Sequence, residues 1–224
     1  MAKFTRLQVA LKIHETGLVP IFYHSDLEVS KNIVLACYQA GVRVIEYTNR
    51  GDFAHELFAE LNKYILREMP EMILGVGSII DAPTAALYMQ IGTNFIVSPV
   101  LKEEIAWVCN KRKIAWVPGC GSVSEISRAE ELGAEFVKVF PAQSVGGPDF
   151  VKSVKGPMPW TSFMITGGVE PTEDNLKKWF SAGAACVGMG SNLITAEVLK
   201  NQDYALLQKN VENALAIINK VKGK

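Results

Sequence analysis

The chain has 224 residues, 49% of them hydrophobic, which is enough material for a sizeable core. Basic and acidic residues both number 23, and the zero net charge argues against nucleic acid or an anionic membrane surface as a partner. The four cysteines are widely spaced, and there is neither a membrane-length apolar run nor a signal-like N-terminus, so we expect a cytoplasmic globular protein.

Short apolar runs alternate with segments of helical periodicity along the whole chain. A leading helix is expected over residues 7–15. Strands are predicted at 18–23, 42–47, 73–77, 95–98, 114–117, 136–140, 162–165 and 185–187. Helices are predicted to follow them at 25–40, 53–68, 81–90, 102–110, 124–132, from Pro148, at 172–182 and at 204–220.

Eight strand–helix units without a linker or a break in composition predict a (β/α)8 (TIM) barrel. We expect one domain over residues 1–224, with an N-terminal helix at about 5–16 and the barrel at about 18–222. An open doubly wound sheet is the alternative, but no G-x-G-x-x-G motif follows the first strand.

A weak repeat links the even-numbered strands. Each is preceded by a helix that ends in glycine, at Gly41, Gly92, Gly133 and Gly183. Five residues after these glycines stand Glu46, Val97, Lys138 and Gly188. Because alternate strands of a barrel share interior layers, this spacing predicts that Glu46 and Lys138 face each other near the C-terminal mouth.

Lys138 lies at the centre of an apolar strand that is closed by Pro141. A buried ammonium loses its hydration, and this loss lowers the pKa of a lysine and favours the nucleophilic amine used in Schiff-base chemistry. A solvent-facing or carboxylate-paired structural lysine is the alternative for this strand taken alone. A carboxylate in the same layer, at Glu46, favours the catalytic interpretation and is suited to moving protons.

Other candidate residues lie at the predicted strand ends. Arg50 follows Glu46 and can grip a substrate carboxylate, although a solvent-facing loop arginine is the simpler interpretation. Residues 75–78 (GVGS) allow the close approach of a ligand to the backbone and to Ser78, or else form a plain turn. Pro99 and Pro118 are expected to shape the mouth.

Two glycine-rich turns follow the last two strands, where barrels often bind phosphate through backbone N–H groups. The predicted anion-binding residues are Thr166, Gly167, Gly168, Gly190 and Ser191. The three histidines lack the spacing of metal ligands, so neither a metal nor another cofactor is expected.

Five stretches together resemble a known family. They are residues 41–50 (GVRVIEYTNR), 75–78 (GVGS), 98–99 (SP), 136–142 (FVKVFPA) and 166–169 (TGGV). In this order they resemble the bifunctional 2-keto-3-deoxy-6-phosphogluconate (KDPG)/4-hydroxy-2-oxoglutarate (KHG) aldolase family, over about residues 20–194.

The resemblance implies a metal-free class I aldolase, a cytoplasmic homotrimer of carbohydrate metabolism of the Entner–Doudoroff type. It implies that Lys138 forms a Schiff base with pyruvate, Glu46 moves protons, and Arg50 and Ser78 hold the pyruvyl carboxylate. The Thr-Gly-Gly loop and the later Gly-Ser would receive the substrate phosphate. The products would be pyruvate and either glyceraldehyde 3-phosphate or glyoxylate.

This chain departs from the family pattern at four positions. Ser78 stands where threonine is common and keeps the hydroxyl. Tyr47, Ile165 and Asn192 are expected near the aldehyde end of the substrate, where they would affect substrate preference. Two other functions are considered, namely a phosphosugar isomerase or epimerase that uses Glu46 as base and a non-catalytic barrel that binds a phosphorylated metabolite.

Overall fold

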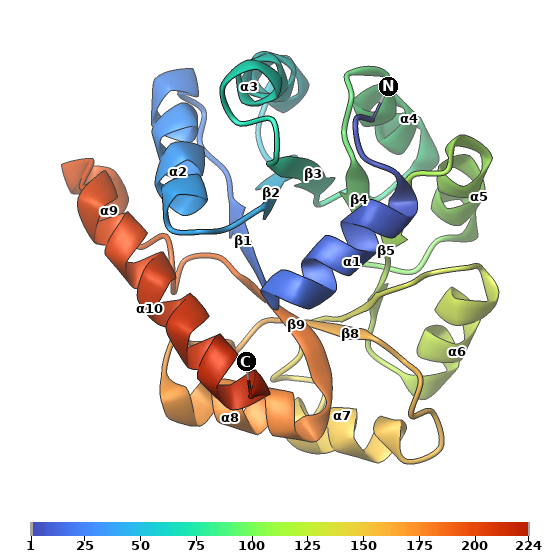
Figure 1. The fold of residues 1–224 in the computed structure, drawn as a ribbon. Helices are drawn as coiled ribbons and strands as arrows, with labels where there is room; N and C mark the ends of the chain where they lie inside the picture. The colour runs from blue at the N-terminus through green and yellow to red at the C-terminus, as the bar shows by residue number, and fades with distance from the viewer. Residues whose placement is uncertain (1, 224) are drawn as a thin grey trace.

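The computed structural model describes residues 2–223, which fold into a barrel of parallel strands surrounded by helices (Figure 1). The strands are β1 (Leu18–Phe22), β2 (Val44–Thr48), β3 (Ile73–Gly77), β4 (Phe95–Val97), β5 (Ala115–Val117), β6 (Gly119–Cys120), β7 (Val137–Val139), β8 (Phe163–Thr166) and β9 (Ala184–Met189). The helices are α1 (Arg6–Thr16), α2 (Leu27–Gln39), α3 (Ala54–Glu68), α4 (Ala82–Gln90), α5 (Glu103–Arg112), α6 (Val123–Glu131), α7 (Gly147–Lys155), α8 (Glu173–Ala182), α9 (Ala196–Asn201) and α10 (Tyr204–Lys222).

The strand order is β5-β4-β3-β2-β1-β9-β8-β7-β6, and every pairing is parallel. β5 pairs with β4, β6 pairs with β7, and only Pro118 separates β5 from β6. These two strands are therefore halves of one barrel strand, so the nine strands occupy eight positions. The predicted (β/α)8 barrel is confirmed.

The fifth barrel strand is longer than the predicted 114–117, because the chain resumes pairing after Pro118 on the other side. Proline has no N–H and cannot donate to a ladder, which explains the interruption. Its carbonyl oxygen still accepts a hydrogen bond from Lys138 N at 2.8 Å. This backbone contact joins the split strand to the strand that carries the lysine.

Side-chain caps set the starts of α2, α4, α6 and α8. Asp26, Asp81, Ser122 and Thr172 each accept a hydrogen bond from the backbone N–H three residues further on. α9 was not predicted from the sequence. It has only six residues, too few to give a periodic pattern, and it begins at a Thr195 cap.

The four glycines of the sequence repeat share one backbone conformation. Gly41, Gly92, Gly133 and Gly183 have φ of 103°, 93°, 83° and 110°, in the left-handed region that favours glycine. β2 and β4 begin three residues after their glycine, β7 begins four residues after it and β9 one residue after it. The helix stop is therefore shared, whereas the distance from the glycine to the strand varies.

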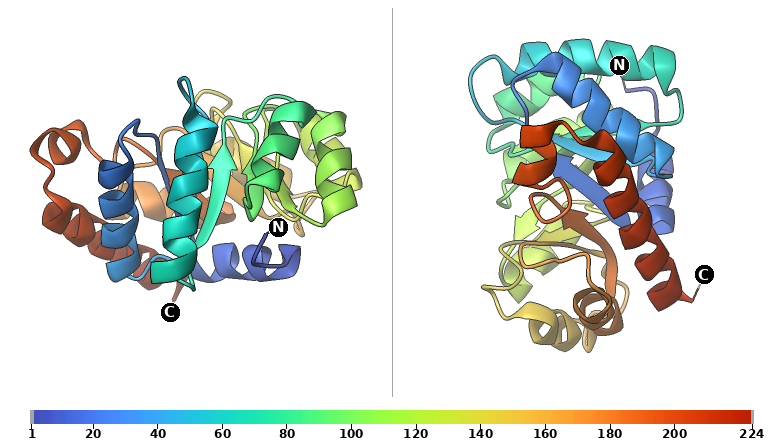
Figure 2. Two further views of the ribbon diagram at one scale, coloured as in Figure 1. Left: turned by 90° about the horizontal axis from the view of Figure 1, so that it is seen from above. Right: turned by 90° about the vertical axis from the view of Figure 1, so that its left-hand side faces the viewer.

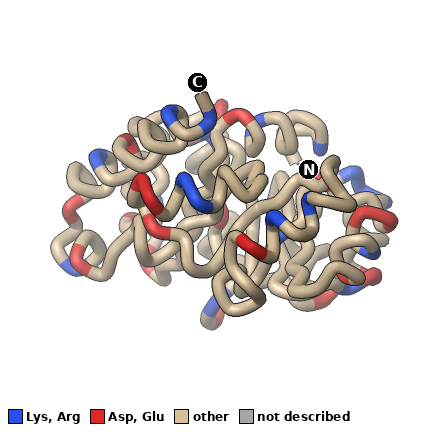
Figure 3. The backbone as a smooth tube through the Cα atoms, turned by 90° about the horizontal axis from the view of Figure 1, so that it is seen from below, with Lys and Arg blue, Asp and Glu red and all other residues tan. Residues whose placement is uncertain are grey.

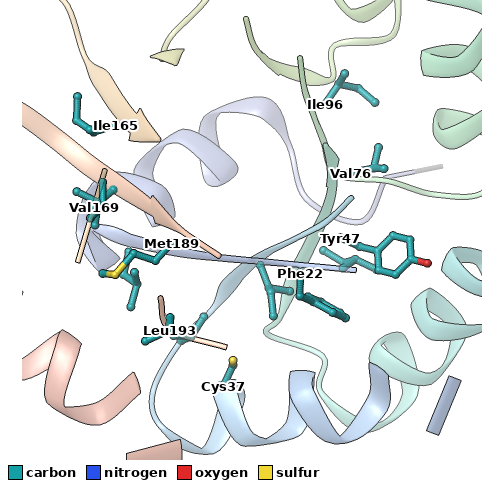
Figure 4. Close-up of a cluster of buried hydrophobic side chains, with 14 of the residues drawn as sticks. Phe22, Cys37, Tyr47, Val76, Ile96, Ile165, Val169, Met189 and Leu193 are labelled. Atoms are coloured by element: carbon teal, nitrogen blue, oxygen red, sulfur yellow. The ribbon is translucent and has the colours of Figure 1, made fainter. Parts of the chain in front are cut away.

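Two apolar clusters fill the molecule. The inner one fills the barrel and includes Val19, Val44 and Met164, and α1 closes its lower end with Val9 and Ile13. Figure 2 (left) shows α1 at the end of the barrel opposite to the arrowheads of the strands. The outer cluster, part of which is drawn in Figure 4, packs the strands against the surrounding helices.

Charged residues lie mainly on the outer helices, where basic and acidic positions are interspersed (Figure 3). Several form ion pairs, such as Arg128 of α6 with Glu103 of α5 and with Glu131. Within residues 2–223, no helix combines the length and the apolar character that crossing a bilayer requires.

Candidate active site

Lys138 lies in the middle of β7, and its side chain is only 6% exposed. Its neighbours Val137 and Val139 face the outer cluster, so the alternation of a strand turns the lysine inward. The Nζ atom lies 4.9 Å from the centre of the Phe140 ring. Burial lowers the pKa of Lys138, Glu46 opposes this shift, and Arg50 adds to it.

Glu46 lies in the middle of β2 and is 1% exposed. Its Oε2 atom is buried and has no hydrogen-bond partner among the described residues. Burial raises the pKa of Glu46, although the charges of Lys138 and Arg50 act in the opposite direction. The charges of Glu46 and Lys138 act on each other, so the predicted acid/base residue and the predicted nucleophile share one buried electrostatic environment.

The sequence predicted that residues 75–77 allow a ligand to approach the backbone closely. In the structure, the glycines of this stretch instead make room for protein side chains. A side chain at Gly77 would overlap the carboxylate of Glu46, and one at Gly75 would overlap the ring of Phe95. The glycines therefore make room for protein groups inside the barrel mouth. Glycine at position 77 is what allows the glutamate to be accommodated there.

Arg50 and Ser78 meet at the mouth. The Nε atom of Arg50 donates a hydrogen bond to Ser78 Oγ at 3.4 Å, and the guanidinium is exposed to solvent. Ser78 is half-buried and has a φ of 61°, an uncommon left-handed conformation for a residue other than glycine. A cation and a hydroxyl are thus available side by side to bind a carboxylate.

Hydrogen bonds to the backbone carbonyl groups of residues 166–169 fix the position of this loop. Hydrogen bonds to its four carbonyl oxygens come from Ala142 N (2.9 Å), Gln143 N (3.2 Å), Asn175 Nδ2 (3.1 Å) and Asn192 Nδ2 (2.8 Å). Within residues 2–223 the N–H groups of Gly167 and Gly168 have no protein partner. Both glycines have positive φ, at 95° and 82°, and consecutive N–H groups in such a turn suit an anion.

The turn after β9 likewise has a bonded carbonyl group and a free backbone N–H group. The carbonyl of Gly190 accepts hydrogen bonds from the N–H groups of Leu193 and Ile194, both at 2.9 Å. The N–H of Ser191 has no partner in the described part of the chain. Asn192 bridges this turn to the 166–169 loop through its bond to Val169 O.

A cavity of about 460 Å³ lies over these loops at the C-terminal ends of β1, β2, β8 and β9. It is lined by Ile21, Phe22, Tyr23, Thr48, Arg50, Thr166, Gly167, Gly168, Val169, Gly188, Gly190, Ser191, Asn192, Ile194 and Leu199. The cavity therefore joins Arg50 to all five residues of the predicted anion site. The cavity is not lined by Glu46, Ser78 or Lys138. Glu46 and Lys138 are buried among the strands.

Pro99 and Pro118 also lie outside the cavity lining. A side chain at Gly119 would overlap the carbonyl of Pro99, so the two proline turns pack closely against each other. Since Pro118 O is bonded to Lys138 N, this packing lies on the lysine side of the mouth.

Two positions expected at the aldehyde end lie elsewhere. Tyr47 and Ile165 belong to the outer cluster and are fully buried there (Figure 4), because each follows an inward-facing residue in its strand. Asn192 does line the cavity. Tyr23 and Thr48, which were not predicted, line it as well, and Thr48 could have been found because it lies two residues after Glu46.

Within residues 2–223, no three His, Cys, Asp or Glu side chains are grouped so that they could hold a metal ion. The fold and the buried lysine beside a buried glutamate define a (β/α)8-barrel protein whose mouth is suited to carbonyl chemistry at an amine.

A family model described as KDPG and KHG aldolase matches residues 9–210. The KHG/KDPG aldolase of Escherichia coli is 30% identical over 208 residues, which cover 92% of this chain and 94% of that protein. The 2-dehydro-3-deoxy-phosphogluconate aldolase of Pseudoalteromonas atlantica is 30% identical over 200 residues, with 89% and 90% covered. The chain belongs to the KDPG and KHG aldolase family, and the resemblance drawn from its motifs is confirmed.

A crystal structure of KDPG aldolase from Legionella pneumophila, with pyruvate captured at low pH as a covalent carbinolamine intermediate, superimposes with a TM-score of 0.84. The two chains are 26% identical, and the match covers 92% of this chain and 98% of the other.

The coupling between the two buried groups predicts a shift in the reactivity of Lys138. In Glu46→Gln the carboxylate that favours the ammonium is lost, so the pKa of Lys138 should fall and its neutral amine should persist to lower pH. The rate of reductive methylation of Lys138 by formaldehyde, followed by peptide mass mapping against pH, measures this. Glu60→Gln, which changes an exposed carboxylate paired with Lys63, should leave the profile in place. If the pH at which the methylation rate of Lys138 rises were higher in Glu46→Gln than in the unchanged protein, the coupling would be contradicted.

Proposed function

We propose that this chain is a class I aldolase that cleaves a 2-keto-3-deoxy-6-phospho sugar acid, or 4-hydroxy-2-oxoglutarate, to pyruvate and an aldehyde. The aldehyde is glyceraldehyde 3-phosphate or glyoxylate, respectively. The observation that carries the proposal is the buried Lys138, with its lowered pKa, beside a buried Glu46 that has one unpartnered oxygen. Family membership supports the reaction class, that of an aldehyde-lyase.

The reaction begins at the lysine. Burial increases the fraction of Lys138 present as the neutral amine, which adds to the C2 carbonyl of the substrate to give a carbinolamine. Protonation of the carbinolamine hydroxyl and loss of water give a protonated imine, whose positive charge makes C2 an electron sink. The carbinolamine with pyruvate in the Legionella pneumophila aldolase supports this first step.

Glu46 then acts as general base. Its carboxylate takes the proton of the C4 hydroxyl, the C3–C4 bond breaks, and the electron pair moves into the imine to give an enamine. The aldehyde leaves, a proton is returned to C3, and water releases pyruvate from Lys138. Burial raises the pKa of Glu46, which brings it closer to neutral pH, where a group can both accept and return a proton.

Both ends of the substrate have partners of suitable charge. Arg50 and Ser78 bind the carboxylate next to the imine, because a guanidinium and a hydroxyl can each donate to its oxygens. The phosphate of the longer substrate binds to the free N–H groups of Gly167, Gly168 and Ser191, across the cavity from Arg50, with Thr166 and Gly190 lining the same cavity. Pro99 and Pro118 shape the lysine side of the mouth.

Two other functions differ from this one in what they predict for the lysine. In an isomerase or epimerase, Glu46 would exchange a proton without cleavage of a carbon–carbon bond, and no imine would form. A non-catalytic binding protein would bind the phosphorylated metabolite without turnover. The lowered pKa of Lys138 favours the aldolase, because an amine that only stabilises charge would be retained as the ammonium.

Trapping of the imine tests the reaction directly. Borohydride in the presence of pyruvate should reduce the imine and leave an adduct on the peptide that contains Lys138. Glu46→Gln should still be trapped, while its turnover falls by about 10²–10⁴-fold because the general base is lost. Lys155 is an internal control. Burial also lowers its pKa, but its amine donates to Pro159 O and Thr161 O away from the cavity, so it should carry no adduct. An unmodified Lys138 peptide would contradict the proposal.

The anion site predicts a preference for the phosphorylated substrate. KDPG should exceed its unphosphorylated counterpart in kcat/KM by about 10- to 100-fold, the range expected for a few charge-assisted hydrogen bonds. Asn192→Ala should reduce this ratio because it releases one glycine-rich turn from the other. The value for the unphosphorylated acid should stay the same in this variant. Equal values for the two acids in the unchanged protein would argue against a phosphate site and leave 4-hydroxy-2-oxoglutarate as the substrate.

Assembly as a homotrimer is also part of the proposal. α4 and α5 pack side by side and carry the exposed Leu87 and Trp107, and the loops before them carry the exposed Ile80 and Val100. Apolar surface of this kind supports an interface between subunits. Light scattering should give three times the mass of the chain, and Trp107→Lys should lower it. Trp160→Lys, at an exposed tryptophan outside this surface, should retain the trimer, whereas a monomeric wild-type chain would contradict the assembly.

The remaining expectations are proposals of the same kind. The four cysteines are all free and buried, which supports a reducing compartment, the cytoplasm. Residues 1–224 are proposed to form one barrel domain. Cleavage of a phosphorylated keto-deoxy acid would place the enzyme in carbohydrate metabolism of the Entner–Doudoroff type.

A further inference from the structure

Four aromatic side chains form a row on the outer side of β2, beneath the loop that carries Arg50. Their ring centres are 5.7 Å apart between Tyr23 and Tyr47, 6.1 Å between Tyr47 and Phe58, and 5.1 Å between Phe58 and Tyr88. Tyr47, Phe58 and Tyr88 are fully buried. The row ends in two tyrosines, and both of these contact the loop over residues 48–51.

Tyr88 lies on α4, and its hydroxyl donates a hydrogen bond to Asn49 Oδ1 at 2.8 Å. A buried tyrosine hydroxyl needs a partner, and this one finds it in a loop 39 residues earlier in the chain. The backbone of Asn49 is fixed as well, because its N–H donates to Gly77 O at 2.8 Å. At the other end of the row, Tyr23 packs so closely on Gly51 that a side chain at position 51 would overlap its hydroxyl.

Arg50 stands between these two anchored residues. Its backbone N–H donates to Thr48 O at 2.9 Å, and its guanidinium reaches Ser78. The side chain itself is long and exposed, so fixing it in one direction costs conformational entropy. An anchored backbone on both sides reduces the number of directions in which the guanidinium can point.

We propose that Tyr88 is a positioning residue, whose hydroxyl acts through Asn49 to hold the 48–51 loop and so aims Arg50 at the substrate carboxylate. The inference rests on the proposed function, in which Arg50 binds that carboxylate. Tyr88 touches neither substrate nor the reacting atoms in this scheme. Its contribution is to pre-organise a binding group, which improves affinity more than the rate of the chemical step.

Tyr88→Phe tests this, because it removes the hydroxyl and keeps the ring that packs on Phe58. The probe is borohydride trapping of the Lys138 adduct over a range of pyruvate concentrations. The half-saturating concentration of pyruvate should rise about 3- to 10-fold, the effect expected for loss of one hydrogen bond. Pyruvamide, which keeps the ketone but has no negative charge, should be trapped at an unchanged half-saturating concentration. An equal shift for both probes would overturn the proposal, because it would point to a general structural effect.

Tyr47→Phe is the matched control. Tyr47 is equally buried in the same row, but its hydroxyl bonds to His24 O at 3.4 Å and has no link to Asn49. The half-saturating concentration of pyruvate in this variant should stay within about twofold of the wild-type value, since the hydrogen bond removed is weak. A shift as large as that of Tyr88→Phe would overturn the assignment to Tyr88.

Asn49→Ala provides an independent test if Tyr88→Phe folds poorly, since it breaks the same link from the loop side. The double variant should shift the pyruvate concentration no further than the larger single change, because both residues act along one path. Additive shifts would overturn the link. Failure of the proposed function looks different, since the wild-type chain would then give no Lys138 adduct with pyruvate at all.

Discussion

The buried pair of Lys138 and Glu46 is the constraint to which the mouth of the barrel is fitted. Removing one ionisable group from water is unfavourable, and each group here lies next to the other, so each limits the loss of charge on its partner. The surrounding chain accommodates them specifically. Gly77 leaves space for the carboxylate, and the break at Pro118 leaves a carbonyl that binds the backbone of the lysine. The same burial that is costly for stability lowers the pKa of Lys138, the direction that the proposed imine formation requires.

The buried ionisable groups and the loops that line the cavity occupy different parts of the barrel mouth. Lys138 and Glu46 are buried among the strands, whereas the loops proposed to bind the charged ends of the substrate line an open cavity. These loops are held by residues that have no role in the chemistry itself. Asn192 ties one glycine-rich turn to the other, and Tyr88 ties the Arg50 loop to α4. Flexible loops can thus present N–H groups and a guanidinium in defined directions.

Most elements of the barrel were predictable from the sequence to within two residues, because hydrophobic periodicity agrees with side-chain caps or glycine stops in many of the units. The glycine repeat also indicated that Glu46 and Lys138 belong together. Three features were missed. The continuation of the fifth strand past Pro118 depends on a new neighbour, β7, that no local pattern reveals. The outward orientation of Tyr47 could have been predicted because it follows the inward-facing Glu46, whereas that of Ile165 depends on which face of β8 meets the helices. α9 is too short to produce a periodic pattern.

The sequence by itself determined the chemistry that this protein can perform, because residue type sets what an amine, a carboxylate or a run of backbone N–H groups can do. It also determined where the helices before the even-numbered strands end, since a glycine in the left-handed conformation follows each of them. Only the tertiary structure decided which groups are buried and which partners they lack. The lowered pKa of Lys138, the unpartnered oxygen of Glu46 and the contact of Tyr88 with Asn49 all arise from segments distant in the chain. The first two arise because closure of the barrel removes inward-facing side chains from water, and the third arises because α4 packs on the outer side of the strands.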